Sequence, residues 1–92
     1  MNTLVTLYQT LEQRRNFEPE TSYTARLFQA GEDEIVKKIG EEAVEVILAV
    51  KGQGEERIIS EIADLTYHTL VLMVSKGITL EQIAAELEQR RK

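Results

Sequence analysis

Two pairs of acidic residues in this sequence have the same spacing, Glu42 with Glu45 and Glu61 with Asp64. Residues three apart in a helix lie on one face, so each pair presents two carboxylates in one direction. Carboxylate oxygens suit Mg²⁺ or Mn²⁺, and bound magnesium usually keeps some waters and completes its shell with substrate phosphates. The repeated spacing therefore points to metal-dependent chemistry on a phosphate compound.

Glu42 is the acid whose position most needs a partner. At roughly 100° per residue, several apolar residues lie within about 60° of it around a helix, namely Ile35, Ile39, Val46 and Ala49. An ionised carboxylate that faces a core is costly unless it is paired or bound to a metal. Glu45 flanks Glu42 one turn later, and Glu41 lies further round. We therefore expect Glu42 to face inward and to bind a cation.

A hairpin would bring the two acidic pairs together. The segment Gly52-Gln53-Gly54 interrupts the helical pattern, and folding about Gln53 places Glu45 level with Glu61 and Glu42 level with Asp64. Both pairs then lie roughly 12 Å from the turn at 1.5 Å per residue. Since four like charges repel without cations, we predict that these four carboxylates bind Mg²⁺. In the alternative, a different register leaves them in salt bridges with Lys38, Arg57 and solvent.

One histidine lies near the predicted cluster. His68 follows Asp64 by one turn, in a segment that is apolar nearly all round. We interpret it as a hydrogen-bonded core residue that orients Asp64 or another acid, with direct metal binding as the alternative. The sequence contains no serine, cysteine or histidine arrangement for nucleophilic catalysis and no glycine-rich phosphate loop.

The elements that position these residues are predicted to be helices only. One proline and five glycines punctuate the chain, and no window keeps the two-residue alternation of a strand. Short connections imply antiparallel neighbours, so the fold class is all-α, an antiparallel bundle of four to five helices. The predicted helices run from behind Thr3 to near Asn16, over 22–30, over 32–51, over 55–76, and from a capping box at Thr79 to about Arg90.

Length and composition restrict the protein to one small domain, 1–92. The chain is 42% hydrophobic and 29% charged, and a domain of this size buries only a modest core. It has no cysteine, so self-association or a metal must make up the shortfall. The apolar segment after Asp64 predicts a subunit interface, and we expect a homodimer.

The charge balance excludes a broad nucleic-acid groove. The formal net charge is -5, from 16 acids and 11 Lys and Arg, whereas nucleic-acid binding needs a basic surface. No charged-then-apolar leader opens the chain, and no apolar run approaches the roughly 20 residues that span a bilayer. We expect a cytoplasmic protein with no membrane partner.

Three segments, in this order and spacing, resemble a known family. The paired acids on a helical hairpin resemble the all-α nucleoside triphosphate pyrophosphatase (MazG-like) superfamily, and the three segments together look like the phosphoribosyl-ATP pyrophosphatases of histidine biosynthesis. The resemblance extends from Leu7 to about Glu88, with no departure at the acidic positions. The segments are Ser22-Tyr23-Thr24-Ala25-Arg26-Leu27, Lys38-Ile39-Gly40-Glu41-Glu42-Ala43-Val44-Glu45, and Glu61-Ile62-Ala63-Asp64-Leu65 followed by Tyr67-His68.

The resemblance implies an activity, a cofactor and an assembly. The activity is Mg²⁺-dependent hydrolysis of phosphoribosyl-ATP to phosphoribosyl-AMP and pyrophosphate, the second step of histidine biosynthesis, in a homodimer whose helices form a joint bundle. The cyclohydrolase domain that is fused to this one in many bacteria and in plants is absent from the sequence, so we expect a stand-alone enzyme.

Roles can be assigned within the matching segments. Glu41 or Glu42 is the candidate base that takes a proton from the attacking water. Lys38 and Arg26 are expected to contact phosphate, although Lys38 has the alternative of a salt bridge to Glu42.

Tyr23 and Thr24 are predicted to bind substrate, with capping of the short helix by Ser22 or Thr24 as the alternative.

Two other functions remain open at this stage. A pyrophosphatase acting on free or damaged nucleoside triphosphates would share the acids and the metal, and only the segments around Tyr23 and His68 favour phosphoribosyl-ATP. A helical dimerisation module without catalysis would leave the acids solvated and would show no dependence on metal.

Overall fold

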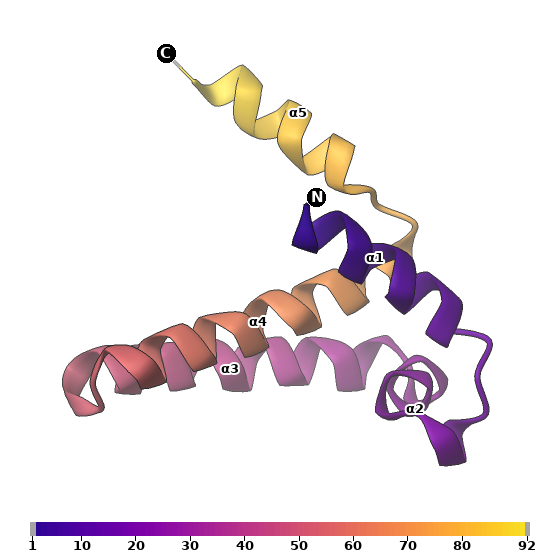
Figure 1. The fold of residues 1–92 in the computed structure, drawn as a ribbon, viewed down its shortest axis with the longest axis horizontal. Helices are drawn as coiled ribbons and strands as arrows, with labels where there is room; N and C mark the ends of the chain where they lie inside the picture. Colours follow the sequence, from indigo (N-terminus) through magenta and orange to yellow (C-terminus); the bar gives the residue numbers. More distant parts are fainter. Residues whose placement is uncertain (1, 92) are drawn as a thin grey trace.

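A computed structural model describes residues 2–91 of the chain. These residues contain no strand, so the predicted all-α class is confirmed for the described part of the protein (Figure 1). The helices are α1 (Thr3–Arg14), the short 3-10 helix η1 (Pro19–Thr21), α2 (Tyr23–Ala30), α3 (Glu32–Gly52), α4 (Glu55–Lys76) and α5 (Leu80–Arg90).

Most helix ends agree with the predicted ends because local capping residues determine them. Ser22 caps α2 by accepting a hydrogen bond from the backbone N–H of Ala25 at 3.2 Å, and Thr79 caps α5 in a complete capping box with Gln82. The first helix differs. Its cap is Asn2, whose Oδ1 accepts from the N–H of Leu4 at 2.8 Å, and it ends at Arg14 rather than near Asn16.

Helices α3 and α4 form one long antiparallel hairpin, as predicted (Figure 1). Helix α3 ends at Gly52, and Gln53 follows as its C-cap. Gly54 is the N-cap of α4 and has a φ of 90°, which an L-residue rarely adopts. At the opposite end of the hairpin, Lys76 Nζ donates to Glu32 Oε1 at 2.8 Å. The turn thus lies where the sequence placed it, which fixes the register of the acidic pairs.

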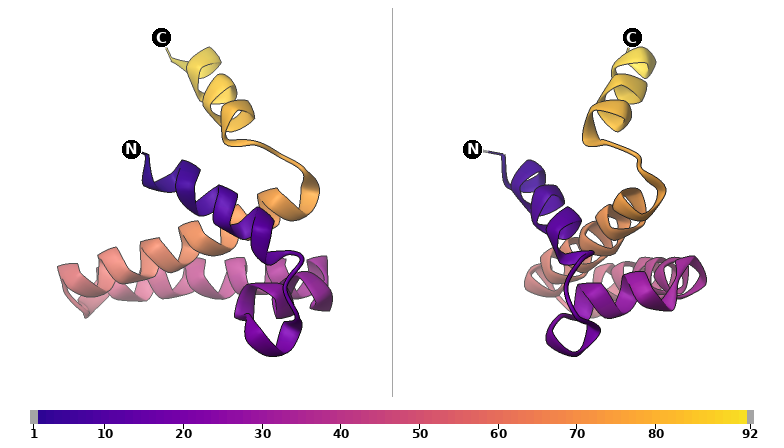
Figure 2. Two further views of the ribbon diagram at one scale, coloured as in Figure 1. Left: turned by 45° about the vertical axis from the view of Figure 1, so that its right-hand side comes forward. Right: turned by 90° about the vertical axis from the view of Figure 1, so that its right-hand side faces the viewer.

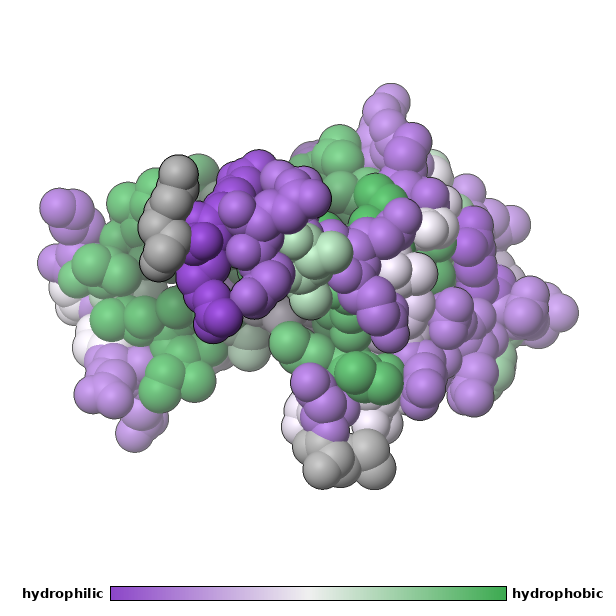
Figure 3. Space-filling view, turned by 90° about the horizontal axis from the view of Figure 1, so that it is seen from above, coloured by the Kyte–Doolittle hydropathy of each residue, from purple (hydrophilic) through white to green (hydrophobic). Residues whose placement is uncertain are grey.

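The hydrophobic core lies where α1 and α2 pack against the open end of the hairpin (Figure 2). Seven buried apolar residues form it: Leu11, Leu27, Ile35, Leu70, Val71, Met73 and Val74. The half of the hairpin nearest the turn extends beyond this core, and apolar side chains are exposed along it (Figure 3). They are Val44, Ile47, Leu48, Val50, Ile59 and Ile62.

Helix α5 does not join the bundle of the single chain, so α1 to α4 make up the part of the predicted bundle of four to five helices that one chain forms. None of its residues is buried, and it points away from the hairpin (Figures 1 and 2). The chain turns at Gly77, whose φ of 71° lies in the left-handed region. The Tyr8 hydroxyl then donates to the carbonyl of Ile78 at 2.7 Å and anchors the connection.

Helix α4 is long and apolar enough, by length and composition alone, to cross a membrane. This corrects the expectation that no segment of the chain approaches that length. The core helices of soluble proteins also reach this length and composition. Helix α4 carries Glu61 and Asp64 and packs along α3, so we interpret it as the central packing helix of the domain.

Leu11 anchors α1 on the core, so its truncation tests the packing. Leu11 is 1% exposed, and Leu11→Ala removes buried methyl groups and leaves a cavity, which should lower the free energy of unfolding by about 2–4 kcal/mol. Gln13→Ala on the exposed side of the same helix should change it by less than about 0.5 kcal/mol. Urea unfolding followed by circular dichroism measures both, and equal effects would contradict this account of the core.

Candidate active site

The N-terminal turn of α2 is fixed on α4 by two adjacent side-chain contacts. Tyr23 Oη and His68 Nε2 are hydrogen bonded at 2.9 Å, and Thr24 Oγ1 is hydrogen bonded to Tyr67 Oη. The rings also pack together, since Tyr67 meets His68 edge-on with centroids 5.0 Å apart and Tyr23 stacks on Tyr67 at 6.5 Å. The segment Tyr23-Thr24 is therefore held against the segment Tyr67-His68.

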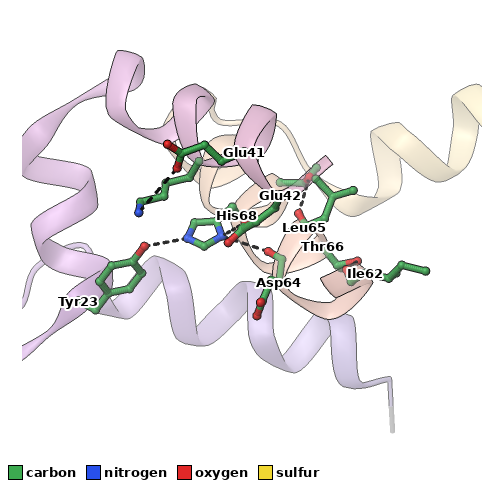
Figure 4. Close-up of polar contacts among 10 residues, drawn as sticks. Tyr23, Glu41, Glu42, Ile62, Asp64, Leu65, Thr66 and His68 are labelled. Atoms are coloured by element: carbon green, nitrogen blue, oxygen red, sulfur yellow. Dashed lines mark hydrogen bonds and ion pairs between the residues drawn. The ribbon is translucent and has the colours of Figure 1, made fainter. Parts of the chain in front are cut away.

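His68 connects this contact to the acidic helix α3. Its Nδ1 donates to the backbone carbonyl of Asp64 at 3.1 Å, so in the neutral ring Nε2 is the acceptor and the Tyr23 hydroxyl is the donor. The same Nδ1 forms an ion-pair contact with Glu42 Oε1 (Figure 4). The predicted role of His68 as a hydrogen-bonded core residue beside an acid is confirmed, and the acid that it contacts through a carboxylate is Glu42.

Glu42 faces inward, as its place in the apolar stripe predicts. Its side chain is 17% exposed and that of His68 is 8% exposed. Although Glu42 Oε1 lies beside the imidazole, the geometry does not make a hydrogen bond, and this buried oxygen has no hydrogen-bond partner among the described residues. Burial raises the pKa of Glu42 above its usual value, and the charge of Asp64 adds to this, while His68 and Lys38 oppose it. The site thus contains a buried carboxylate oxygen that makes no hydrogen bond and lies against the His68 imidazole.

The other three predicted ligands differ in their surroundings. Glu61 is buried and forms an ion pair with Arg57 one turn earlier, which is the salt bridge that the alternative reading of the acids expected. Glu45 is half-buried and Asp64 is exposed. Within the described residues 2–91, no group of three or more His, Cys, Asp or Glu side chains is arranged to hold a metal ion. The four-carboxylate site therefore remains a prediction.

The chemistry of the donors fits a hard divalent cation. Glu42, with its unsatisfied oxygen, and Asp64, whose charge acts on it, bring carboxylates from both helices of the hairpin to one region. Figure 4 shows the Asp64 side chain directed away from the imidazole, while its backbone carbonyl accepts from it. Oxygen ligands of this kind are those that Mg²⁺ prefers.

The basic residues of the matching segments lie at the edge of this region. Lys38 pairs with Glu41 at 4.0 Å rather than with Glu42, and the Glu41 side chain is 54% exposed. The guanidinium of Arg26 lies 5.8 Å from the centre of the Tyr23 ring and donates from Nη1 to the carbonyl of Pro19 at 3.0 Å. Thr24, in contrast, is buried, so here its hydroxyl holds α2 on α4.

Sequence reasoning did not find the contacts of Tyr23 with His68 and of Thr24 with Tyr67. Helical spacing relates residues within one helix, whereas these contacts join segments more than 40 residues apart. Composition held a signal, because the chain has only three tyrosines and two lie in the matching segments.

Comparison with known proteins agrees with the segments identified above. A family model described as phosphoribosyl-ATP pyrophosphohydrolase matches residues 4–91. A phosphoribosyl-ATP pyrophosphatase of Leptospira biflexa is 56% identical over 90 residues, which are 98% of this chain and 98% of that protein. One from Clostridium botulinum strain Hall is 51% identical over 90 residues, 98% of this chain and 82% of the relative.

A third relative, the phosphoribosyl-ATP pyrophosphatase of Lacticaseibacillus casei, is 51% identical over 84 residues, which are 91% of this chain and 76% of the relative. The likeness covers both acidic pairs and all of α2 and α4. The chain belongs to the phosphoribosyl-ATP pyrophosphohydrolase family.

Proposed function

We propose that this protein hydrolyses phosphoribosyl-ATP to phosphoribosyl-AMP and pyrophosphate, the second step of histidine biosynthesis. Membership of the family supports phosphoribosyl-ATP as the substrate. The observation that carries the chemistry is Glu42, a half-buried carboxylate whose buried Oε1 makes no hydrogen bond and lies against the His68 imidazole. A negative charge in such a position costs free energy unless a cation or a proton balances it. Hydrolysis of a phosphate compound uses both a metal cation and a group that takes a proton from water.

The proposed cofactor is Mg²⁺, held by Glu42, Glu45, Glu61 and Asp64. A bound magnesium ion neutralises charge on the pyrophosphate leaving group and lowers the pKa of water. Glu42 and Asp64 support this placement most directly, because they lie on opposite helices and the charge of Asp64 helps to raise the pKa of Glu42. For Glu61 to take part, its carboxylate must leave the ion pair with Arg57.

Glu42 and Glu41 are the two candidates for the base that takes the proton from the attacking water. Burial raises the pKa of Glu42, and a carboxylate with a raised pKa holds a proton more readily. Glu41 is exposed beside Lys38. The inward position of Glu42 against His68 supports Glu42 for this step.

Substrate contacts are proposed for Lys38, Arg26 and Tyr23, which line one edge of the region. Lys38 is half-exposed and its nearest acid lies at 4.0 Å, so its ammonium is available to phosphate oxygens. Arg26 and Tyr23 are exposed side chains that stack on each other. The Arg26 cation suits the phosphate of a nucleotide, and the Tyr23 ring suits its base. A contact from Thr24 would require its buried hydroxyl to leave Tyr67.

The proposed assembly is a homodimer in the cytoplasm, formed through the exposed side of the hairpin. Residues of α3 recur at spacings of four and three, which is the pattern of helices that pack together along their length: Val36, Gly40, Ala43, Ile47 and Val50. A Cβ added at Gly40 would meet nothing within 4 Å, so the space beside α3 is open at this position of the stripe. Ile47 lies about 140° round the helix from Glu42, so a partner on this stripe leaves the acids accessible.

Activity provides the direct test of the proposed function. Pyrophosphate should be released from phosphoribosyl-ATP in the presence of Mg²⁺ and not in EDTA, and dATP and dCTP should be poor substrates. Asp64→Asn should lower kcat by about 10²-fold or more, since it removes charge stabilisation of the transition state. Asp33→Asn, on the exposed first turn of α3, is the matched control. Hydrolysis of dATP or dCTP instead would indicate a general nucleotide pyrophosphatase, and no turnover with unaltered metal binding in Asp64→Asn would indicate a non-catalytic module.

The stability of the metal-free protein should depend on the charge of Glu42. Because its pKa in the folded state is raised above the usual 4.5, the ionised carboxylate destabilises the fold, and this loss grows as the pH rises through the folded pKa. Glu42→Gln should therefore be more stable than the parent in EDTA at pH 7, and the difference should shrink toward pH 4. Mg²⁺ should raise the melting temperature of the parent and not that of Glu42→Gln. Glu41→Gln is the exposed control, and equal pH profiles for all three proteins would contradict the prediction.

His68 and Tyr23 should act as positioning residues for Glu42. Asn places an amide nitrogen near the position of Nδ1, whereas Gln reaches only toward the position of Nε2, so His68→Asn should retain more of kcat than His68→Gln. Tyr23→Phe removes the hydroxyl that holds Nε2 and should lower kcat by about 10-fold. Thr69→Val, which removes a hydroxyl bonded only to the helix carbonyl of Leu65, is the control. Equal kcat values with lowered melting temperatures would show a purely structural role.

A further inference from the structure

Glu61 is the acid that the fold buries most deeply. Its side chain is 7% exposed, and among the described residues 2–91 it is the only Asp or Glu that is buried. It lies on α4 in the half of the hairpin that extends beyond the core, where α4 packs along α3. An ionised carboxylate in such a position needs a counter-ion. The structure provides the guanidinium of Arg57, whose Nη2 contacts Glu61 Oε2.

Arg57 occupies a poor position for helix stability. It is the third residue of α4, and the positive end of the helix dipole favours acids in the first turn. The order of the pair is also the weaker one, because an acid that precedes the base by four residues is more stabilising than the reverse. The pair of Glu86 with Arg90 on α5 has the favourable order, with Arg90 in the last turn. Helix stability therefore does not explain a cation at position 57.

Arg57 and a magnesium ion would compete for the same carboxylate. In the proposed site Glu61 is one of four carboxylates that hold Mg²⁺, and a divalent cation on this carboxylate repels a guanidinium that touches it. The Arg57 side chain is 52% exposed, so it can turn into solvent without disturbing the core. Binding of Mg²⁺ by Glu61 must therefore break the ion pair, and the free energy of the pair is subtracted from the metal affinity.

We propose that Arg57 is the counter-ion of Glu61 in the metal-free protein and sets the concentration of Mg²⁺ at which the site is loaded. Arg57 neutralises the buried carboxylate until Mg²⁺ takes its place, and the guanidinium is then released to solvent. Glu61 thus exchanges one cation for another and is never buried as an unpaired charge. The inference rests on the proposed metal role of Glu61, and it does not require Arg57 to contact the substrate.

The Mg²⁺ affinity of an Arg57 variant tests the proposal in the full-length protein without substrate. Arg57→Gln removes the competing charge, so isothermal titration calorimetry should give a Mg²⁺ Kd about fivefold lower than that of the parent, the factor expected for the loss of one partly exposed ion pair. Arg90→Gln removes the exposed pair with Glu86 on α5, and Lys51→Gln removes a cation in the last turn of α3, near the same hairpin turn. Both controls should stay within about twofold of the parent Kd.

The effect of Arg57 should require Glu61. In a Glu61→Gln background the competition is absent, so the further change Arg57→Gln should leave the Mg²⁺ Kd of that background unchanged. The metal-free protein should respond in the opposite direction. In EDTA, Arg57→Gln should have a lower melting temperature than the parent, because it leaves the charge of Glu61 buried and unpaired, and adding Glu61→Gln should restore most of the loss.

Nuclear magnetic resonance of the arginine side chains follows the ion pair in the unsubstituted protein. The guanidinium signals of Arg57 should change as Mg²⁺ is added, over the same concentrations that load the site, while those of Arg90 should not.

Two results would overturn the exchange and leave the metal site in place: a Mg²⁺ Kd that is the same in Arg57→Gln and the parent, or Arg57 signals that do not respond to bound Mg²⁺. A parent protein that binds no Mg²⁺ would overturn both the exchange and the proposed cofactor. Hydrolysis of phosphoribosyl-ATP would still test the proposed reaction separately.

Discussion

The contact between His68 and Glu42 is the interaction on which the arrangement of this site depends. This contact joins the two helices of the hairpin at the level of the acids. The other ring nitrogen of His68, Nε2, reaches α2 through Tyr23. Three consecutive helices, α2, α3 and α4, therefore meet at one imidazole. A carboxylate placed in an apolar stripe needs such a neighbour, because burying the charge without one costs free energy that so small a core offsets only in part.

The hairpin presents its acids and its exposed apolar residues on different sides. Helical periodicity places Glu42 and the acids near it on one side of α3, while Val36, Ile47 and Val50 lie well round the helix from them. Under the proposed functions, packing on one side and phosphate chemistry on the other would then vary independently. The core proper occupies only the open end of the hairpin, so the acidic half depends on the register of α3 and α4 for its geometry.

Much of the fold could be predicted from the sequence, and the reasons are local. The glycines at 31, 54 and 77 all have positive φ and mark helix boundaries, and the bounds of α4 agree with the prediction because Gly54 and Gly77 flank it. The inward position of Glu42 follows from periodicity. Pairing across helices could not be derived in the same way: Lys38 contacts Glu41 instead of Glu42, and α5 lies outside the bundle, because rotamers and the direction of a connection depend on tertiary structure.

The docking of α2 has a consequence for the local stability of the domain. Helix α2 has eight residues, too few to persist alone, and its first turn is held by neighbouring contacts to Tyr67 and His68. A rotation of α2 by one residue, about 100°, would break both contacts at once. Partial docking is therefore unfavourable, and α2 forms a small cooperative unit whose local unfolding would release His68 and disorder the site while the hairpin remained folded.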